Sequence, residues 1–384
     1  MKRILFFVES LSGGGAEKVL VTLLRHLDQR KYAITLVALV DTGILREEID
    51  TEKISYLPVI RPSSRPFVSL WNKAKYKLIY KYLPVRLVCK WIIPQKGIDL
   101  YVAFTEGFAT KLLAFAPGPK LAWVHIDLSK FPWTIEKKVF RNIEVESSFY
   151  HRFNNIVCVS NSVELAMKSH YGLINTRTIL NPIESEGILT KARSFNAQDY
   201  QLDNSFRIAS VGRLCHQKGY DSLIPLIGRL RDNHFNISLF LIGEGEDLHK
   251  LKTMTEELRL ENTVVFTGYL NNTYALMSQM DLFVCSSRAE GFSLAIAEAI
   301  CLGLPIISMN CSGPDQLLDG GNYGVLCEDY DALYDALEKA VANRAFLNLL
   351  KDKAKNRAAF FNLSETMRQV ESLFDDALCQ TSVS

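Results

Sequence analysis

The sequence predicts an α/β fold with two doubly wound domains, each built around a parallel sheet. The chain has 384 residues, and single hydrophobic cores stop growing near roughly 250–300 residues, so two domains are expected. In both halves, short β-rich runs alternate with segments of helical spacing, which is the pattern of βαβ units. Between the halves, a polar stretch after Asn181-Pro182 interrupts this pattern.

The expected elements follow one another in regular order. The strands of the first half are expected at Ile4–Val8, Ile34–Val40, Leu100–Phe104, Leu121–Val124 and Ile156–Ser160, with a first helix at Glu17–Leu27. The strands of the second half are expected at Ile208–Val211, Ser238–Ile242, Val264–Phe266, Leu282–Cys285 and Pro305–Ser308. Helices are expected there at Ser222–Arg231, Asp247–Arg259, Ala295–Cys301 and Ala332–Ala342. Strands that read as continuous apolar runs are typical of parallel sheets covered on both faces.

These elements divide the chain into residues 1–185, a linker at 186–205, residues 206–362 and a C-terminal segment at 363–384. The C-terminal segment has apolar residues at helical spacing, namely Met367, Val370, Leu373, Phe374 and Leu378. It is therefore predicted to be an amphipathic helix, with a short tail, that packs back toward the first domain. A ligand is expected in the cleft between the domains.

Composition places the chain among ordinary globular proteins, with 48% hydrophobic and 22% charged residues. The apolar opening at Ile4–Val8 ends at Glu9 and is shorter than the roughly 7–15 apolar residues of a signal-peptide core. No run approaches the roughly 18 apolar residues of a membrane span. The eight cysteines form no CxxC pair and several lie in apolar runs, which is typical of reduced core thiols. We therefore expect a cytoplasmic protein.

The net charge is only +2, but it is unevenly distributed. Residues 1–190 hold 26 Lys and Arg against 17 Asp and Glu, a net +9, whereas residues 191–384 hold 18 against 25, a net −7. Segment 53–98 contains ten cations and no acid, and lysines recur every four residues from Lys73 to Lys81 beside tryptophan and tyrosine. Helices with this pattern are typical of proteins that rest on anionic membranes. Plain surface, or a nucleic-acid contact, would also fit a basic face; we predict a membrane-facing segment and no nucleic-acid partner.

A first candidate site is the glycine cluster Gly13-Gly14-Gly15, which follows the first strand and opens a helix. Glycines let a backbone approach a ligand closely, and the free amides of a helix N-terminus favour a diphosphate. The cluster departs from the dinucleotide-binding pattern GxGxxG, because Lys18 occupies the place of the third glycine. A turn with a purely structural role is the alternative.

A second candidate site follows the strand at Ile208–Val211. Arg213 stands at the end of this strand and Lys218 just before the next helix, at the edge where open α/β sheets bind ligands. Both cations could neutralise a diphosphate. Solvated surface cations are the alternative.

The most specific candidate site is the pair Glu290 and Glu298, which flanks seven residues after the strand Leu282–Cys285. Glu298 lies within an apolar helix pattern, where a charge is costly unless it accepts hydrogen bonds, for instance from ribose hydroxyls. Glu290 precedes the helix N-terminus and could contact a sugar. The alternative for Glu290 is a helix-capping acid.

Taken together, these motifs resemble the retaining glycosyltransferases of family four, which have the GT-B fold with two facing Rossmann-like domains. The resemblance covers nearly the whole chain. It includes Gly14–Glu17, Val211–Leu214, Lys218-Gly219, Ile242–Gly245, Gly268–Leu270, Glu290, Glu298, Gly313-Pro314 and Leu317-Leu318.

The resemblance implies roles for individual residues. It places the nucleotide-sugar donor on Gly14, Gly15, Arg213, Lys218, Gly243, Tyr269, Glu290, Gly291, Phe292, Ser293, Leu294 and Glu298. It places Glu106, His125 and Asp127 on the acceptor side. It assigns the catalytic roles to Glu290, His125, Arg213 and Lys218. On the residues alone, a lone histidine at a strand end, such as His125, is more often a satisfied core residue.

The implied reaction breaks a bond from an anomeric carbon to phosphate and keeps the anomeric configuration. Cations and helix-end amides oppose the charge that grows on the diphosphate, so neither a metal nor another cofactor is expected. Asp329–Asp331 reads Asp-Tyr-Asp, a pattern that in other glycosyltransferases suggests a metal, but it opens the helix at Ala332 and is predicted to cap it.

The predicted function is transfer of a hexose or N-acetylhexosamine from a nucleotide sugar, with UDP the expected nucleotide, to a lipid-linked saccharide. The setting would be bacterial polysaccharide biosynthesis, such as capsule or O-antigen, at the inner face of the cell membrane. Two alternatives stay open: a sugar-nucleotide epimerase of the same fold, and a catalytically idle partner of another glycosyltransferase.

Overall fold

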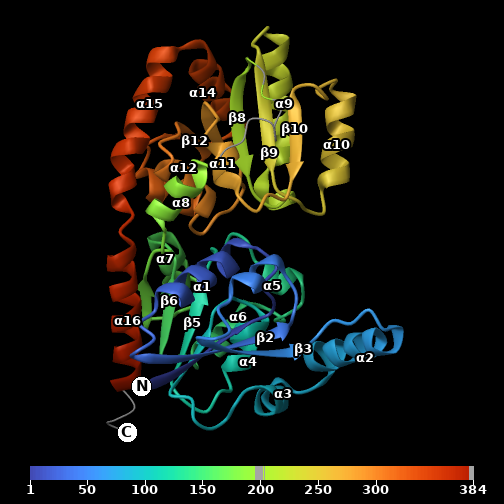
Figure 1. The fold of residues 1–384 in the computed structure, drawn as a ribbon, viewed down its shortest axis with the longest axis vertical. Coiled ribbons are helices and arrows are strands. Elements are labelled where there is room, and N and C mark those ends of the chain that lie inside the picture. Colours follow the sequence, from blue (N-terminus) through green and yellow to red (C-terminus); the bar gives the residue numbers. More distant parts are fainter. Residues whose placement is uncertain (195–201, 203, 380–384) are drawn as a thin grey trace. The chain divides into compact units, whose positions relative to one another are not determined.

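The computed structural model describes residues 1–194, 202 and 204–379. These form two compact units: Met1–Pro182 with the C-terminal segment from Ser364 make the first, and Ile183–Leu363 make the second. Each unit contains one sheet whose strands all pair in parallel (Figure 1). The predicted fold class, two doubly wound α/β domains, is confirmed.

The first unit is built on a seven-stranded sheet with the order β3-β2-β1-β4-β5-β6-β7. Its strands are β1 Lys2–Val8, β2 Tyr32–Val40, β3 Ile54–Ile60, β4 Leu100–Ala103, β5 Lys120–Val124, β6 Asn155–Cys158 and β7 Thr176–Thr178. The interior strand β1 is fully buried from Ile4 to Val8, which explains its uninterrupted apolar sequence.

Helices and short helical turns connect these strands. They are α1 Gly15–His26, η1 Ile44–Glu48, α2 Pro66–Lys77, η2 Leu78–Tyr82, α3 Val85–Ile92, α4 Phe108–Leu113, α5 Trp133–Glu136, α6 Ile143–Tyr150 and α7 Asn161–Ser169. Two of them begin at typical side-chain caps: Asn142 accepts from the amide of Val145 before α6, and Ser160 accepts from the amide of Val163 before α7.

The second unit repeats the same winding with the order β10-β9-β8-β11-β12-β13. Its strands are β8 Phe206–Val211, β9 Ile237–Ile242, β10 Val264–Gly268, β11 Leu282–Cys285, β12 Ile306–Met309 and β13 Val325–Cys327. Its helices and turns are α8 Ser185–Ala192, η4 His216–Lys218, α9 Tyr220–Asp232, α10 Leu248–Glu257, α11 Thr273–Met277, α12 Leu294–Cys301, α13 Ser312–Leu318, α14 Tyr330–Ala342, α15 Arg344–Arg357 and η5 Ala358–Phe360.

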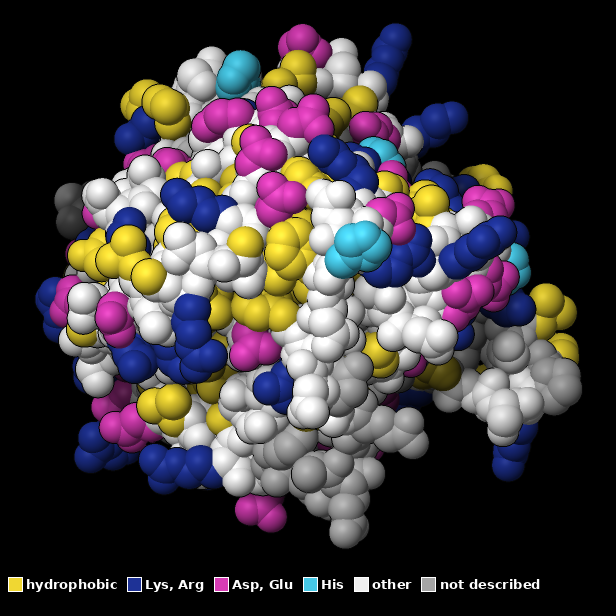
Figure 2. All heavy atoms as spheres, turned by 90° about the horizontal axis from the view of Figure 1, so that it is seen from above, with side chains coloured by type: hydrophobic (Ala, Val, Ile, Leu, Met, Phe, Trp, Pro, Cys, Tyr) yellow, Lys and Arg dark blue, Asp and Glu magenta, His cyan; other side chains and the backbone are white. Residues whose placement is uncertain are grey.

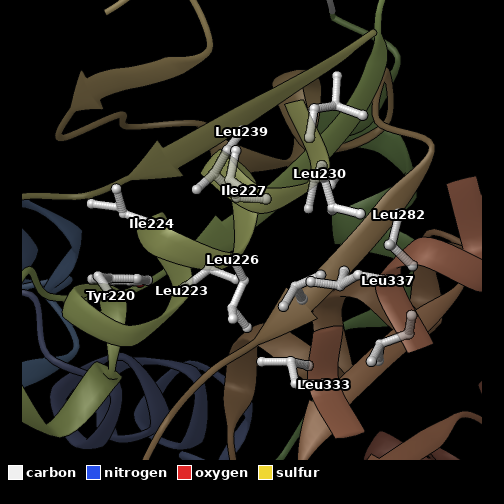
Figure 3. Packing of buried hydrophobic residues seen from close by; sticks show 14 of the residues in the cluster. Tyr220, Leu223, Ile224, Leu226, Ile227, Leu230, Leu239, Leu282, Leu333 and Leu337 are labelled. Carbon is white, nitrogen blue, oxygen red and sulfur yellow. The ribbon is translucent and has the colours of Figure 1, made fainter. Parts of the chain in front are cut away.

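One face of α9 packs into the hydrophobic core of the second unit. Its buried side chains, from Tyr220 to Leu230, lie in one cluster with Leu239 of β9 and Leu282 of β11 (Figure 3). Leu337 of α14 belongs to the same buried cluster. Each fully buried leucine contributes roughly 1.5–3 kcal/mol, so this cluster fixes α9 firmly on the sheet.

Three edge strands were not predicted from the sequence: β3, β7 and β13. The first of these occupies the start of the basic segment 53–98, so that part of the segment belongs to the sheet. Pro58 interrupts the strand pattern of β3, and proline is tolerated in a strand mainly at a sheet edge, where β3 lies. β7 and β13 have only three residues each, too few for a periodic pattern.

The predicted linker at 186–205 begins within a helix, because α8 spans Ser185–Ala192. Residues 195–201 and 203 of the predicted linker lie outside the described residues. The chain passes from one unit to the other between Pro182 and Ile183, and again between Leu363 and Ser364.

The C-terminal helix α16, Leu363–Cys379, packs on the first unit as predicted. The ring of Phe374 meets those of Phe6 and Tyr32 edge-on, at centroid distances of 6.1 and 5.8 Å. Glu371 pairs with Lys31 at 3.0 Å, and the Tyr32 hydroxyl donates to Asp375 at 3.1 Å. A buried aromatic contact and polar contacts around it thus attach this helix to the first unit.

On the face drawn in Figure 2, acidic and basic side chains are interspersed. None of the helices in the described part of the chain combines the length and the hydropathy that crossing a bilayer requires.

Candidate functional site

The candidate site of the second unit lies where its strand order reverses. β8 pairs with β9 on one side and with β11 on the other, and open α/β sheets bind ligands at such a switch point, beyond the carboxyl ends of the strands. Arg213 follows β8 and is exposed. Lys218 ends the turn η4 after β8, and Glu290 lies in the loop after β11. The sheet therefore brings together two motifs predicted from the sequence, the one that carries Lys218 and the one that carries Glu290.

Lys218 and Glu290 form a largely buried ion pair. The Lys218 ammonium lies 2.5 Å from Glu290 Oε1, and the side chains are 20% and 10% exposed. The Ser287 hydroxyl donates to the same carboxylate oxygen at 2.7 Å. Burial opposes the charge on Lys218, but the Glu290 carboxylate outweighs this and holds the pKa of Lys218 above its ordinary value. The site thus keeps a fixed positive charge beside a fixed acceptor.

The loop from Glu290 leads into α12 without a side-chain cap. Ser293, the residue before α12, has φ of +63° and makes no capping hydrogen bond through its side chain. Gly291 and Phe292 are buried, and Leu294 is the first residue of the helix. Since Glu290 binds Lys218 and Ser287, the interpretation of Glu290 as a helix cap is wrong. The first amides of α12 have no partner within the helix, as at any helix N-terminus.

Glu298 is buried in the middle of α12 and is 5% exposed. The hydroxyl of Tyr274, in α11, donates to its carboxylate at 3.2 Å. Sequence reasoning missed Tyr274, and no motif in the chain points to it. Ser287 was missed as well, although its place three residues before Glu290 in the same loop was a usable signal.

Gly243 and Tyr269 lie at the ends of the neighbouring strands β9 and β10. Gly243 has φ of +139°, and a Cβ there would lie 2.2 Å from the carbonyl oxygen of Gly212, so only glycine fits. Its amide donates to the carbonyl of Gly268 at 3.0 Å. Tyr269 is 43% exposed, and its amide donates to Glu244 at 3.3 Å. The two residues therefore flank the carboxyl end of β8 from the β9 side.

In the first unit, Glu106 and His125 form a connected arrangement. One oxygen of the buried Glu106 carboxylate accepts from the amides of both His125 and Ile126. His125 Nε2 lies 2.8 Å from the carbonyl oxygen of Phe104. A carbonyl only accepts, so Nε2 must carry the proton, and Nδ1 of the neutral ring is then an acceptor. His125 therefore offers an acceptor nitrogen at the end of β5.

Burial shifts both side chains toward their neutral forms. It raises the pKa of Glu106 to about 7, although backbone amides, including those of His125 and Ile126, act in the opposite direction. It lowers the pKa of His125 to about 4, against the hydrogen bond to Phe104. His125 is therefore an uncharged hydrogen-bonding group at neutral pH.

The other predicted residues of the first unit have local contacts. Asp127 Oδ1 accepts from the amide and hydroxyl of Ser129, at 3.0 and 2.5 Å, and so shapes its own loop. Gly14 is the N-cap residue of α1 and Gly15 is its first residue. Gly14 has φ of −70°, a value open to other residues, so its backbone conformation does not require glycine.

Asp329 caps α14, as predicted. Its Oδ1 accepts from the amide of Ala332 at 2.8 Å, and Asp331 pairs with Arg229 at 3.3 Å. Among the residues that the structure describes, no group of three His, Cys, Asp or Glu side chains is placed to hold a metal ion.

Comparison with known proteins assigns a family to each half of the chain. The model for "Glycosyltransferase Family 4" matches residues 13–186, and the model for "Glycosyl transferases group 1" matches residues 193–357. The chain is 27% identical over 371 residues to a Campylobacter jejuni enzyme, with 94% of this chain and 96% of that protein covered. That enzyme is named N-acetylgalactosamine-N,N'-diacetylbacillosaminyl-diphospho-undecaprenol 4-alpha-N-acetylgalactosaminyltransferase.

Solved structures agree in fold. HepE from Anabaena, in complex with UDP and glucose, has a TM-score of 0.76 at 20% identity and covers 98% of this chain and 100% of its own. Sucrose-phosphate synthase from Thermosynechococcus elongatus has a TM-score of 0.79 at 17% identity, with 99% and 100% covered. With a family model matched on each half of the chain, the protein belongs to the family 4 glycosyltransferases, which have the GT-B fold of two Rossmann-like domains.

Proposed function

We propose that the protein is a retaining, metal-independent glycosyltransferase that moves a hexose or N-acetylhexosamine from a UDP-sugar to a lipid-linked saccharide. The observation that carries the proposal is the buried pair Lys218–Glu290 beside the N-terminus of α12, with Glu298 buried farther along this helix. The HepE structures with UDP and with UDP-glucose support a UDP-sugar donor. The name of the Campylobacter relative, which specifies a diphospho-undecaprenol, supports a lipid-linked acceptor.

In this proposal, Lys218 and Arg213 bind the donor diphosphate. Negative charge grows on the diphosphate as the anomeric bond breaks, and fixed positive groups in a partly buried site stabilise it strongly. Lys218 is held charged by Glu290, and Arg213 is exposed for contact with the donor. The first amides of α12 add partial positive charge. These groups supply the electrostatic stabilisation that a metal ion provides in other transferases, so no metal is needed.

Glu298, Gly243 and Tyr269 bind the nucleoside, and Glu290 with the backbone from Gly291 to Leu294 binds the sugar. A carboxylate has roughly four acceptor positions, so ribose hydroxyls would add to the hydrogen bond that Tyr274 already gives Glu298. When the donor binds, the charge of Lys218 is shared between Glu290 and the diphosphate, which leaves Glu290 able to accept from a sugar hydroxyl.

His125 contributes a hydrogen-bond acceptor from the first unit. Its Nδ1 is suited to a hydroxyl of the transferred sugar or of the acceptor, and Glu106 holds the backbone that carries it. Asp127 would help to form this acceptor side by fixing the loop that follows. Gly14 and Gly15 would present the backbone at the start of α1 to the donor.

The membrane surface is proposed to be the basic segment around α2, η2 and α3. Large apolar side chains on these elements are exposed instead of packed: Phe67 82%, Trp71 66%, Tyr82 73% and Trp91 56%. Lys73, Lys77 and Lys81 are exposed beside them. Aromatic residues interleaved with cations suit the interface of an anionic bilayer, where a lipid-linked acceptor would be reached from the cytoplasm.

The direct test is to incubate the purified protein with a panel of nucleotide sugars, with and without lipid-linked saccharides. Transfer is expected only when both substrates are present, and a chelator should leave it intact. Lys218→Ala and Arg213→Ala should each lower turnover roughly 10²-fold, which is the usual effect of removing one group that stabilises charge in the transition state. Lys252→Ala, at an exposed position of α10, is the matched control and should behave like the parent.

Other outcomes would select among the alternatives. Conversion of a nucleotide sugar without any acceptor would indicate an epimerase. Binding of a lipid-linked sugar without turnover of any donor would indicate an idle partner. Loss of activity with the chelator, restored by a divalent cation, would contradict the metal-independent mechanism.

A further inference from the structure

Arg288 links the two loops that carry Lys218 and Glu290. We propose that Arg288 is a positioning residue: its bidentate ion pair with Asp221 holds the turn that carries Lys218 against the loop that carries Glu290. The consequence for catalysis rests on the proposed function, in which Lys218 binds the donor diphosphate. The structural claim, that Arg288 keeps Lys218 on Glu290, does not depend on it.

Both terminal nitrogens of the Arg288 guanidinium donate hydrogen bonds. Nη1 donates to Asp221 at 2.8 Å and to the carbonyl of His216 at 2.6 Å. Nη2 donates to the other Asp221 oxygen at 3.1 Å and to the hydroxyl of Ser222 at 3.0 Å. A planar fork matched to a carboxylate fixes direction as well as distance, which a lysine at this position would not do.

Backbone contacts extend this link along the turn η4. The amide of Arg288 donates to the carbonyl of Gln217, and the side-chain amide of Gln217 donates to the carbonyl of Ala289, both at 2.8 Å. The Ser286 hydroxyl donates to the carbonyl of Lys218 at 2.8 Å. The two loops are therefore joined on both sides of the Lys218–Glu290 pair.

Gly219 makes the close approach of the two loops possible. It has φ of +68°, and a Cβ there would lie 2.1 Å from the carbonyl oxygen of Ser286. Glycine tolerates both the left-handed backbone and this contact. The backbone next to Lys218 is consequently packed directly on the backbone after β11.

Asp221, the acid that pairs with Arg288, is held rigidly. Asp221 lies in the first turn of α9, whose buried face is packed in the core of the second unit (Figure 3). Lys218 itself has a flexible four-carbon side chain, so the position of its ammonium depends on where its backbone is held. A misplacement of about 1 Å can cost roughly 10²-fold in rate, which is why this link would affect turnover.

The experiment combines two measurements on the full-length protein. In the first, an amine-acylating reagent is applied without ligand, and labelling of Lys218 is followed by mass spectrometry. In the parent, the buried pair with Glu290 should keep labelling slow; Arg288→Ala should speed it at least about 3-fold, because a lost coupling of the usual size releases the lysine. The labelling readout requires no glycosyl transfer.

The second measurement is a double-mutant cycle on turnover. Arg288→Ala should lower kcat/KM about 10-fold in the parent but less than about 2-fold when Lys218 is already alanine, because its effect passes through Lys218. Arg288→Lys should recover only part of the loss, since it offers no planar fork. Arg229→Ala is the matched control: Arg229 lies on α9, the helix that carries Asp221, pairs with Asp331 and stacks on Tyr334, and its loss should change neither readout.

The two measurements separate the inference from the proposed function. Faster labelling of Lys218 without any detectable transfer in the parent supports the positioning role and contradicts the proposed function. Unchanged labelling in Arg288→Ala, or an equal loss of turnover with and without Lys218, overturns the positioning role even if the protein is an active transferase. Full recovery by Arg288→Lys overturns the bidentate basis of the proposal.

Discussion

Glu290 and Glu298 are both buried carboxylates, but different neighbours compensate their charges. Glu290 accepts from a cation and a hydroxyl on one oxygen, and Glu298 accepts from the hydroxyl of Tyr274. An ion pair compensates a buried charge more strongly than a neutral donor does. The ion pair with Lys218 therefore fixes Glu290 within the second unit before any ligand arrives.

Glu106 provides a prediction for stability against pH. Burial raises its pKa from 4.5 to about 7. Between pH 4.5 and pH 7, the folded chain therefore keeps a proton on Glu106 that the unfolded chain has lost. The stabilisation from the neutral form is complete below pH 4.5 and is lost as the pH rises through 7. Glu106→Gln keeps an acceptor oxygen for the two amides and carries no charge. Its stability relative to the parent should rise between pH 5 and 8, by up to about 3 kcal/mol.

Urea unfolding of the first unit at several pH values measures this difference. Glu144→Gln, at an exposed position of α6, is the control, and its difference from the parent should stay constant. A difference for Glu106→Gln that is equally constant would show that the buried carboxyl does not titrate in this range.

At the scale of elements, the helices α2 and α3 differ from the helices around them. The helices α1 and α4 bury their large apolar residues, whereas α2 exposes Phe67 and Trp71 and α3 exposes Trp91. The π-helical turn η2, Leu78–Tyr82, follows α2, and within it Ile79 is buried while Tyr82 is exposed. Lys75 is held inward, donating to the carbonyl of Val59 at 2.7 Å. Lys73, Lys77 and Lys81 are exposed, so only some of the cations in segment 53–98 are available to a membrane surface.

This pattern leads to a prediction for membrane binding. Changing Lys73, Lys77 and Lys81 together to Glu should abolish most co-sedimentation with anionic vesicles, because each cation near such a surface contributes roughly 1 kcal/mol. Binding of the parent should weaken steeply with salt, since the Debye length is about 8 Å at physiological ionic strength. Neutral vesicles should bind poorly.

The control changes three exposed lysines of the second unit, Lys250, Lys252 and Lys351, to Glu. It alters the net charge by the same amount, so it should sediment like the parent if location matters more than total charge. UDP binding should persist in both triple variants. A variant at Lys73, Lys77 and Lys81 that still sediments normally would leave these lysines as ordinary solvated surface.

At the scale of the whole molecule, the first unit is discontinuous in sequence. Its sheet is complete by β7, but α16 returns to it only after the entire second unit has been made. Phe374 of α16 is fully buried against Phe6 and Tyr32. The first unit therefore reaches its full stability only when the C-terminal helix is present.

Phe374→Ala tests this dependence. It should lower the free energy of unfolding of the first unit by roughly 3–5 kcal/mol, the usual cost of such a core truncation, and leave the transition of the second unit unchanged. Calorimetry or hydrogen exchange resolves the two units. Phe360→Ala, at a position 37% exposed in η5, is the control and should cost about 1 kcal/mol or less. Equal losses in both units would indicate that they unfold as one.

Local sequence patterns predict the two α/β units, most of their interior strands and the amphipathic C-terminal helix. These follow from local patterns: a strand buried on both faces is a continuous apolar run, and a helix with one buried face repeats its apolar residues every three or four positions. The motifs around Arg213, Lys218, Glu290 and Glu298 were also visible, because each follows a recognisable strand. The edge strands β3, β7 and β13 were not, since they are short or interrupted by proline.

Which partner each of these residues contacts depends on the three-dimensional arrangement of the strands. The pairing of Lys218 with Glu290, the hydrogen bond from Tyr274 to Glu298 and the ion pair of Arg288 with Asp221 join positions 24 to 72 residues apart in the chain. Such contacts depend on the order of strands in the sheet, which no local pattern contains. The same holds for the pKa of Glu106 and of His125, because desolvation is set by what surrounds a group in space.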